Sequence, residues 1–355
     1  MTPDPSVLTA AATRHSWWRR GALTLGIGSV ASLAWAAATL YANTDGSRID
    51  KPLWDVLAWS VSRSSDAGLP RSGPLPVVRE AQGVAAAQPG ELSATWLGHA
   101  SVLLRLDEVT LLTDPQFSPR ASPVSWAGPE RFTPLPYAPQ ALPHIDIVLL
   151  SHNHYDHLDV PSLRQLMAQP GGAPLFVVPQ GVQSLLKDEG IGPVQVLGWW
   201  QHAELAGVEV TGVPAHHWSA RGMFDRHTTH WGGWVLRKGG RSAYYVGDTG
   251  YSADFRAIGE RFPGLELALI PVGAYEPREF MKDQHVNPTE AVQIHRDVGA
   301  RHSLGIHWGT FPLADESPEQ TQEDVAQALA AQQLPAEALR LIAHGATWRI
   351  DPVAR

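Results

Sequence analysis

The segment 151–159, SHNHYDHLD, concentrates side chains that bind metal ions. It holds three histidines and two aspartates and follows an apolar run typical of a buried strand. In an extended chain, residues two apart point the same way, so we expect His152 and His154 to face one cation. If the chain then turns, Asp156 and His157 face a second cation beside the first. Imidazole and carboxylate donors without thiolate suit zinc and tolerate manganese or iron.

A polar loop whose histidines cap the next helix is the alternative interpretation of this segment. Leu158, Leu163, Leu166 and Met167 do predict a helix after the loop, with Pro161 in its first turn. A cap needs only one short polar side chain, however, and this loop supplies five titratable ones. We therefore prefer the metal site.

Three later segments repeat one design, in which a strand-like run is followed by a candidate ligand. The candidates are the pair His216 and His217, of which we expect one to bind, then Asp248, then His307. Each metal ion needs about four donors, so one loop alone does not hold two ions. A lone histidine at a strand end is commonly structural, and only the repetition of the design favours ligands.

These motifs resemble the metallo-β-lactamase fold superfamily, which has the order HxHxDH, His, Asp and His. A narrower resemblance, to N-acylphosphatidylethanolamine-hydrolysing phospholipases D, covers about residues 94–350. It rests on the segments TWLGHASVLL, LLTDPQFSPRASP, LLSHNHYDHLD, VGDTGY, PVGAYEPREFMKDQHVNPTEAV and IHWGTF. The fold that it implies belongs to the α/β class: an αββα sandwich of metallo-β-lactamase type, with the site along one edge of the sheets.

The resemblance also implies which residues bind metal. Asp248 would bridge two zinc ions, and His217 is chosen over His216 because the family's ligand directly precedes a tryptophan, here Trp218. The two sites implied are His152, His154 and His217 for one zinc and Asp156, His157 and His307 for the other.

The same resemblance also implies which residues lie near the metals without binding them. Gln284 and His285 match a Gln-His pair that the family places at the reacting phosphate, so the candidate catalytic residues are Asp248, His285 and Gln284. Asn287 stands where the family usually has aspartate, and we expect it to keep the role of helix N-cap. Asp114 and Asp159 are our candidates for orienting ligand imidazoles.

The expected chemistry is hydrolysis of a phosphodiester. Two metals roughly 3.5 to 4 Å apart share a hydroxide from an acidified water and clamp the attacking and leaving oxygens. The resemblance implies hydrolysis of N-acylphosphatidylethanolamine-type phospholipids to phosphatidic acid and an N-acylethanolamine. The alternatives are a lactonase or other ester hydrolase of the superfamily, and a non-catalytic, membrane-tethered binding protein.

The N-terminal part of the chain predicts membrane targeting. Residues 21–44 carry no charge and follow a polar and basic tail, 1–20. A stretch of this length can cross a bilayer, and its positive flank is N-terminal. We therefore expect an N-terminal hydrophobic helix, as a transmembrane anchor or a signal peptide, and a domain that is membrane-anchored or exported, at the periplasmic face if the source is bacterial. A buried helix of a soluble protein is the alternative.

The elements that position the donors are expected within residues 91–355, the metallo-hydrolase domain, after a linker, 45–90, draped on it. Residues 253–262 and 288–298 have helical spacing, and a capping box at Ser317 predicts a last helix through about residue 333. Strands recur in both halves, which fits the αββα sandwich, with ligands on loops at the strand ends.

Composition limits the partners. The chain has no cysteine, which excludes disulfides and thiolate ligands. Its formal net charge of -8 argues against a nucleic-acid partner, because phosphate binding needs a cationic face. Its 14 tryptophans, a residue type that prefers the boundary between lipid and water, fit a phospholipid or other amphiphilic substrate at a membrane. The sequence leaves a homodimer open.

Overall fold

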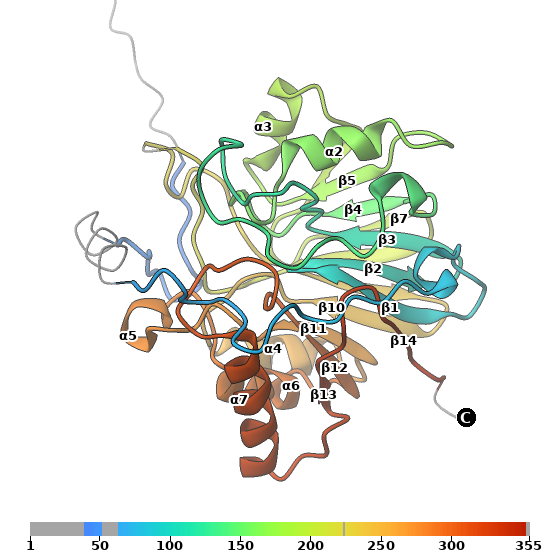
Figure 1. Ribbon diagram of the computed structural model, residues 1–355. Coiled ribbons are helices and arrows are strands. Elements are labelled where there is room, and N and C mark those ends of the chain that lie inside the picture. Colours follow the sequence, from blue (N-terminus) through green and yellow to red (C-terminus); the bar gives the residue numbers. More distant parts are fainter. Residues whose placement is uncertain (1–38, 52–62, 223, 353–355) are drawn as a thin grey trace, which may run out of the picture. The chain divides into compact units, whose positions relative to one another are not determined.

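Two seven-stranded β-sheets form the framework that carries the candidate donors (Figure 1). The computed structural model describes residues 39–51, 63–222 and 224–352, which belong to one compact unit, 39–355. The strand orders are β14-β1-β2-β3-β4-β5-β6 and β13-β12-β11-β10-β9-β8-β7. The described elements are η1 (Ala81–Val84), β1 (Leu92–Gly98), β2 (Ser101–Leu106), β3 (Val109–Thr113), η2 (Pro139–Ala141), β4 (Ile147–Leu149), α2 (Val160–Met167), β5 (Leu175–Val178), α3 (Val182–Asp188), β6 (Val194–Val196), β7 (His202–Leu205), β8 (Val208–Val213), β9 (Gly233–Lys238), β10 (Arg241–Tyr245), α4 (Asp254–Arg261), β11 (Leu267–Pro271), α5 (Arg278–Met281), α6 (Pro288–Asp297), β12 (His302–Ile306), α7 (Pro318–Ala331), β13 (Leu339–Arg340) and β14 (Thr347–Arg349).

Apolar packing on both faces of each sheet produces the predicted αββα order of layers. On β2, Val102 and Leu104 pack in the core between the sheets, whereas Leu103 packs in a second core with α2 and α3. Successive side chains of a strand point to opposite faces, so a strand covered on both sides is apolar throughout. Helices α4, α6 and α7 cover the outer face of the other sheet (Figure 1).

Strand direction brings the candidate residues to one edge of each sheet. In the first sheet, β1 and β3 are both antiparallel to β2, and β4 is parallel to β3. In the second, β8 and β10 are both antiparallel to β9, and β11 and β12 continue parallel to β10. The strands β1, β3 and β4 therefore end at one edge, as do β8, β10 and β12. Each of these six strands is followed by a residue of the candidate site.

The helices predicted within the metallo-hydrolase domain are present, and those with predicted bounds differ from them by one or two residues at their ends. Asn287 and Glu290 form a complete capping box at the start of α6, so asparagine does serve as the N-cap. At α7 only half of the predicted capping box forms. The Ser317 hydroxyl accepts from the Gln320 amide, whereas the Gln320 side chain accepts from Arg71 instead.

The N-terminal predictions are only partly covered by the described residues. The predicted tail 1–20, residues 21–38 of the uncharged segment and residues 52–62 of the predicted linker lie outside them. Residues 63–90 contact the domain, for example through the main-chain pairing of Val77 with His344. Within the described ranges, no helix has the length and apolar composition needed to cross a membrane.

Candidate metal centre

The imidazoles of His152, His154 and His217 converge on one point. His152 Nε2 lies 2.8 Å from His154 Nδ1, which lies 3.3 Å from His217 Nε2. Two nitrogens bound to one tetrahedral zinc at about 2.0 to 2.1 Å are about 3.3 Å apart, so this spacing fits three ligands of one cation. Burial lowers the pKa of His154 to about 3 and that of His217 to about 4. These side chains are therefore neutral at pH 7, which is the form that binds metal.

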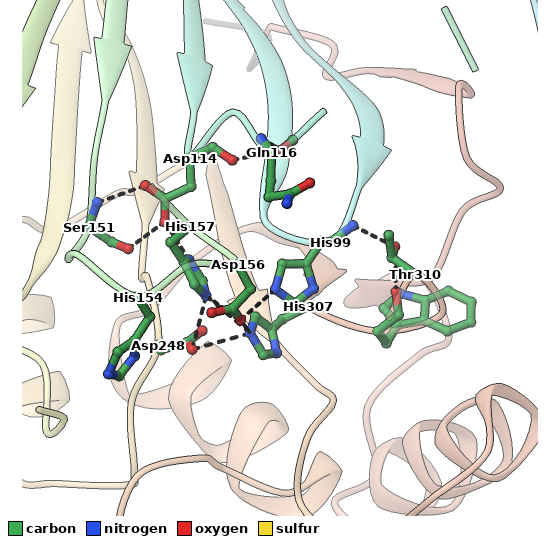
Figure 2. A network of polar contacts seen from close by, with 12 residues as sticks. His99, Asp114, Gln116, Ser151, His154, Asp156, His157, Asp248, His307 and Thr310 are labelled. Atoms are coloured by element: carbon green, nitrogen blue, oxygen red, sulfur yellow. Dashed lines mark hydrogen bonds and ion pairs between the residues drawn. The ribbon is translucent and has the colours of Figure 1, made fainter. Parts of the chain in front are cut away.

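A second group of donors lies beside the first (Figure 2). His157 Nε2 and His307 Nε2 are 3.2 Å apart, and Asp156 Oδ2 lies 3.2 Å from the first nitrogen and 3.4 Å from the second. Burial alone would lower the pKa of both histidines. The carboxylates of Asp248 and Asp156 overcome this effect and raise the pKa of His157 well above its ordinary value and that of His307 to about 9. The site thus attracts positive charge, which a divalent cation supplies.

Asp248 lies between the two groups. Its Oδ2 is 3.1 Å from His157 Nε2, 3.2 Å from His307 Nε2 and 3.9 Å from His217 Nε2. Burial would raise the pKa of Asp248, but His157 and His307 hold it well below the usual range. Its other oxygen, Oδ1, is buried and has no hydrogen-bond partner in the described part of the chain. A buried anionic oxygen without a donor is costly, and a pair of cations bridged by this carboxylate would satisfy it.

The structure distinguishes the two adjacent histidines after β8. His217 belongs to the first group, whereas His216 turns away from it. His216 Nε2 lies 3.2 Å from Ser47 Oγ, and its Nδ1 lies 2.8 Å from the main-chain oxygen of Asp283. Of the pair, His217 is therefore the residue that the fold brings to the other donors.

Asp114 orients one of the predicted ligands. Its Oδ2 accepts a 2.6 Å hydrogen bond from His157 Nδ1, and its Oδ1 accepts from the Ser151 amide at 2.8 Å (Figure 2). The buried hydroxyls of Ser151 and Tyr245 also donate to this carboxylate. The resulting network turns His157 Nε2 toward Asp248, as expected of a carboxylate behind a metal-binding imidazole.

The expectation for Asp159 was wrong. Its carboxylate accepts from the Ser162 amide at 3.2 Å and from the Ser118 hydroxyl at 2.7 Å, and so caps helix α2 instead of orienting an imidazole. The helix begins directly after this residue, which brings the amides of its first turn closer to the carboxylate than any ligand.

His285 and Gln284 have different positions. His285 Nδ1 lies 3.8 Å from Asp248 Oδ2 and has no hydrogen-bond partner among the described residues. Burial lowers its pKa well below the ordinary value, so the ring is neutral. The side chain of Gln284 accepts from Trp218 Nε1 at 3.1 Å, and its main-chain oxygen lies 3.0 Å from His217 Nδ1. His285 therefore faces the donor cluster, whereas Gln284 holds a ligand and its neighbour in place.

His99 is a residue of the site that the sequence reasoning missed. Its Nε2 lies 2.9 Å from Asp156 Oδ2, and its main-chain oxygen accepts from the His307 amide at 3.0 Å (Figure 2). Burial lowers its pKa to about 3. His99 follows β1 and Gly98, which repeats the design of strand, small residue and donor. That signal was present in the sequence and could have found it.

Asn43 is a second such residue, for which the sequence gave no signal. Its Oδ1 accepts from the His217 amide and from Trp231 Nε1, each at 3.0 Å, and the side chain is buried. It belongs to an N-terminal arm, residues 39–51, which is far from His217 in the chain. Only the folded structure shows that this arm fixes the backbone of a predicted ligand.

The donor set fits two adjacent cations. It offers imidazole nitrogens and carboxylate oxygens within 4.8 Å of one another in each group, with Asp248 shared between them. Zinc accepts such donors, and so do manganese and iron.

Comparison with known proteins places the chain in a family. The sequence profile of the beta-lactamase superfamily domain matches residues 110–308, which is more than half of the chain. N-acyl-phosphatidylethanolamine-hydrolyzing phospholipase D 1 of Caenorhabditis elegans is 42% identical over 232 residues, which are 62% of this chain and 65% of that protein. The mitochondrial N-acyl-phosphatidylethanolamine-hydrolyzing phospholipase D of Saccharomyces cerevisiae is 38% identical over 229 residues, which are 62% of this chain and 48% of that protein. The chain thus spans between about half and two thirds of these relatives.

A solved structure supports the same fold. Igni18, a metallo hydrolase from the archaeon Ignicoccus hospitalis, has a TM-score of 0.54 at 21% identity, over 74% of this chain and 99% of its own. The profile match contains all seven predicted metal donors. Sequence, fold and donor geometry agree, and the chain belongs to the beta-lactamase superfamily of metal-dependent hydrolases.

Proposed function

We propose that the protein is a zinc-dependent phosphodiesterase that hydrolyses N-acylphosphatidylethanolamine-type phospholipids to phosphatidic acid and N-acylethanolamine. The observation that carries the proposal is the convergence of two donor groups on the shared carboxylate of Asp248. The substrate class is suggested by the names of the two eukaryotic relatives and by the motifs around the site.

Different residues of the centre have different roles in the proposed reaction. A pair of bound cations would acidify water and neutralise charge on phosphoryl oxygens. Asp156 and Asp248 supply the negative charge that holds such cations. His285, neutral and 3.8 Å from Asp248, is placed to donate a hydrogen bond to a phosphoryl oxygen. Asp114 keeps His157 in one orientation, so the donors need little reorganisation during the reaction.

We further propose that the protein acts at a membrane, anchored by or exported through the uncharged segment that begins at residue 21. Residues 39–44 of the predicted segment 21–44 pack on the domain instead, through Tyr41 and the buried Asn43. The support is the uncharged length of that segment and its basic flank. Fractionation of the source cells, followed by protease treatment of intact cells, tests this proposal. Recovery of the protein in the soluble cytoplasmic fraction would overturn it.

Substrate turnover by the purified full chain tests the catalytic proposal. N-acylphosphatidylethanolamine and a panel of lactones are offered in parallel, with release of N-acylethanolamine measured by mass spectrometry. We expect the phospholipid to be preferred, activity to disappear on chelation, and zinc to restore it. Preference for lactones would replace the proposed substrate with the alternative one. Activity that survives complete removal of metal would contradict the metal mechanism.

A further inference from the structure

Exposed apolar side chains gather on two loops and on the N-terminal arm. Large apolar side chains that are exposed singly are ordinary on protein surfaces, so their grouping is the informative observation. Among the described residues they are Leu40 (47% exposed), Val124 (36%), Trp126 (80%) and Phe224 (93%). We call these four residues the apolar rim.

The first loop holds two members of the rim at its tip. It leaves the end of β3 shortly after Asp114. The Ala121 amide donates to the Pro129 oxygen at 3.0 Å, and the Arg131 amide donates to the Pro119 oxygen at 2.8 Å. These bonds close a stem from which residues 122–128, including Val124 and Trp126, extend into solvent.

The second loop holds Phe224 in the same way. This loop begins after Trp218, the residue that directly follows the predicted ligand His217. The His227 amide donates to the Ser219 oxygen at 2.8 Å, and the Asp225 carboxylate accepts from the Gly222 amide at 2.8 Å. The backbone is thus braced on both sides of Phe224, so exposure of this ring follows from the loop's own hydrogen bonds.

The two loops lie across a common cleft. Its volume is about 1100 Å³, and its walls include Val124 from the first loop, Asp225 from the second, and Asn153 and Tyr155 from the metal loop. Arg221 of the second loop donates to the main-chain oxygen of Asn153 at 2.9 Å. The second loop, which carries Phe224, is therefore bonded to the segment that holds four of the predicted donors.

The N-terminal arm joins the same surface. The Tyr41 amide donates to the His227 oxygen at 2.8 Å, which places Leu40 next to the second loop. Leu40 also belongs to the uncharged segment 21–44, for which the sequence predicts contact with a membrane.

We propose that the apolar rim inserts into the interfacial layer of a lipid bilayer and holds the metal centre at the membrane surface. Separate convex tips with a cleft between them fit a deformable lipid layer better than a rigid protein partner, which would need matching hollows. Tryptophan and phenylalanine at such tips are favourable at the lipid boundary. The inference deepens the proposed function and rests on it for the lipid substrate.

Site-specific labels test the insertion directly. The chain has no cysteine, so Trp126→Cys and Phe224→Cys each give one labelling site in the full-length protein, and Gln327→Cys on the exposed side of α7 gives the matched control. With vesicles of phosphatidylcholine and N-acylphosphatidylethanolamine, a polarity-sensitive dye at 126 or 224 should shift to shorter wavelength and be quenched by lipid-borne quenchers. The dye at 327 should stay in water. Dyes at 126 and 224 that remain in water, or a dye at 327 that enters as well, would overturn the proposal.

Activity on two physical forms of the substrate separates this inference from the proposed function. The double variant Trp126→Ser, Phe224→Ser should hydrolyse vesicle-borne substrate about tenfold more slowly, since a buried aromatic side chain contributes an effect of at least that order. Its hydrolysis of a short-chain, monomeric N-acylphosphatidylethanolamine should be unchanged. Equal loss on both forms would argue against docking. Insertion of the labels without any hydrolysis of this lipid would support the rim and overturn the proposed substrate.

Discussion

Asp248 is the residue through which the two donor groups of the centre are joined. The neutral imidazoles of His154 and His217 lie on one side of it, and the more basic His157 and His307 lie on the other. Burial lowers the pKa of all four histidines, and only in the second pair do nearby carboxylates outweigh it and raise the pKa. Asp248 and Asp156 together therefore raise the pKa of the second pair, whereas the first pair stays neutral.

Asp248→Asn removes this charge at nearly constant shape. We expect hydrolysis to fall by at least about a hundredfold, with loss of bound metal, because even residues behind a ligand commonly contribute up to that factor. Metal analysis, circular dichroism and turnover measure metal content, fold and activity in one preparation. His144→Ala is the matched control, since that histidine contacts Pro170 away from the cluster. Full activity with normal metal content would remove the two-metal mechanism.

His285→Ala tests a residue that faces the centre without completing either donor group. We expect turnover to fall about a hundredfold, the order expected for loss of one hydrogen-bond donor to developing charge. Metal content should stay at the wild-type level. Loss of metal from this variant would show instead that His285 is a ligand.

Several site residues could be predicted because their signal is local. The spacing of His152, His154 and His157 depends only on neighbours in one loop, and the fold does bring them together. The role of Asp159 was missed because an aspartate that caps a helix and an aspartate that orients an imidazole look alike in a sequence. His99 follows a strand and a glycine, a pattern that was present but was not used. No pattern in the sequence indicates Asn43.

The N-terminal arm, residues 39–51, shows how one element supports another across the fold. It contacts the loop after β8 through three different side chains: Asn43 with His217, Ser47 with His216, and Asp50 with His227. Such contacts between distant segments have no periodic pattern in the sequence. Helices α2 and α4, by contrast, follow from local spacing, and α6 follows from local spacing and its Asn287 cap, which is why they could be predicted.

Asn43→Ala tests the support that the arm gives to the centre. It leaves the buried His217 amide without an acceptor, which costs about 1 to 3 kcal/mol. We expect the fold to remain and the zinc affinity to fall about tenfold, measured by competition with a chelator. Thr44→Ala, which removes an exposed hydrogen bond of the same arm to Asp254, should leave zinc affinity unchanged. Equal affinity in the two variants would show that the arm does not position His217.

At the scale of the whole molecule, the segment before β1 is attached to the last long helix. The Glu319 carboxylate of α7 accepts from the hydroxyl and amide of Ser72 at 2.7 and 2.9 Å and from the Arg71 amide at 3.0 Å. Burial raises the pKa of Glu319, but these hydrogen bonds outweigh it and lower the pKa to about 2.

Glu319→Gln gives a prediction for stability against pH. Because the folded pKa lies below the ordinary value of 4.5, the ionised side chain stabilises the fold above about pH 4.5, and this contribution is lost as the pH falls toward 2. In urea unfolding of the metal-free protein, the variant should be less stable than wild type at pH 6, with a difference that shrinks at lower pH. A difference that is constant with pH would assign the effect to packing alone.

His157 Nε2 and His307 Nε2 lie 3.2 Å apart, although 150 positions separate the two residues along the chain. A ribosome adds roughly 5 to 20 residues per second, so the nascent chain carries the loop 152–157 for roughly 8 to 30 seconds before its last partner is synthesised. During translation the four donors of the loop are joined first by His217, then by Asp248 and last by His307, and metal loading of the complete centre waits until the residue after β12 has left the ribosome.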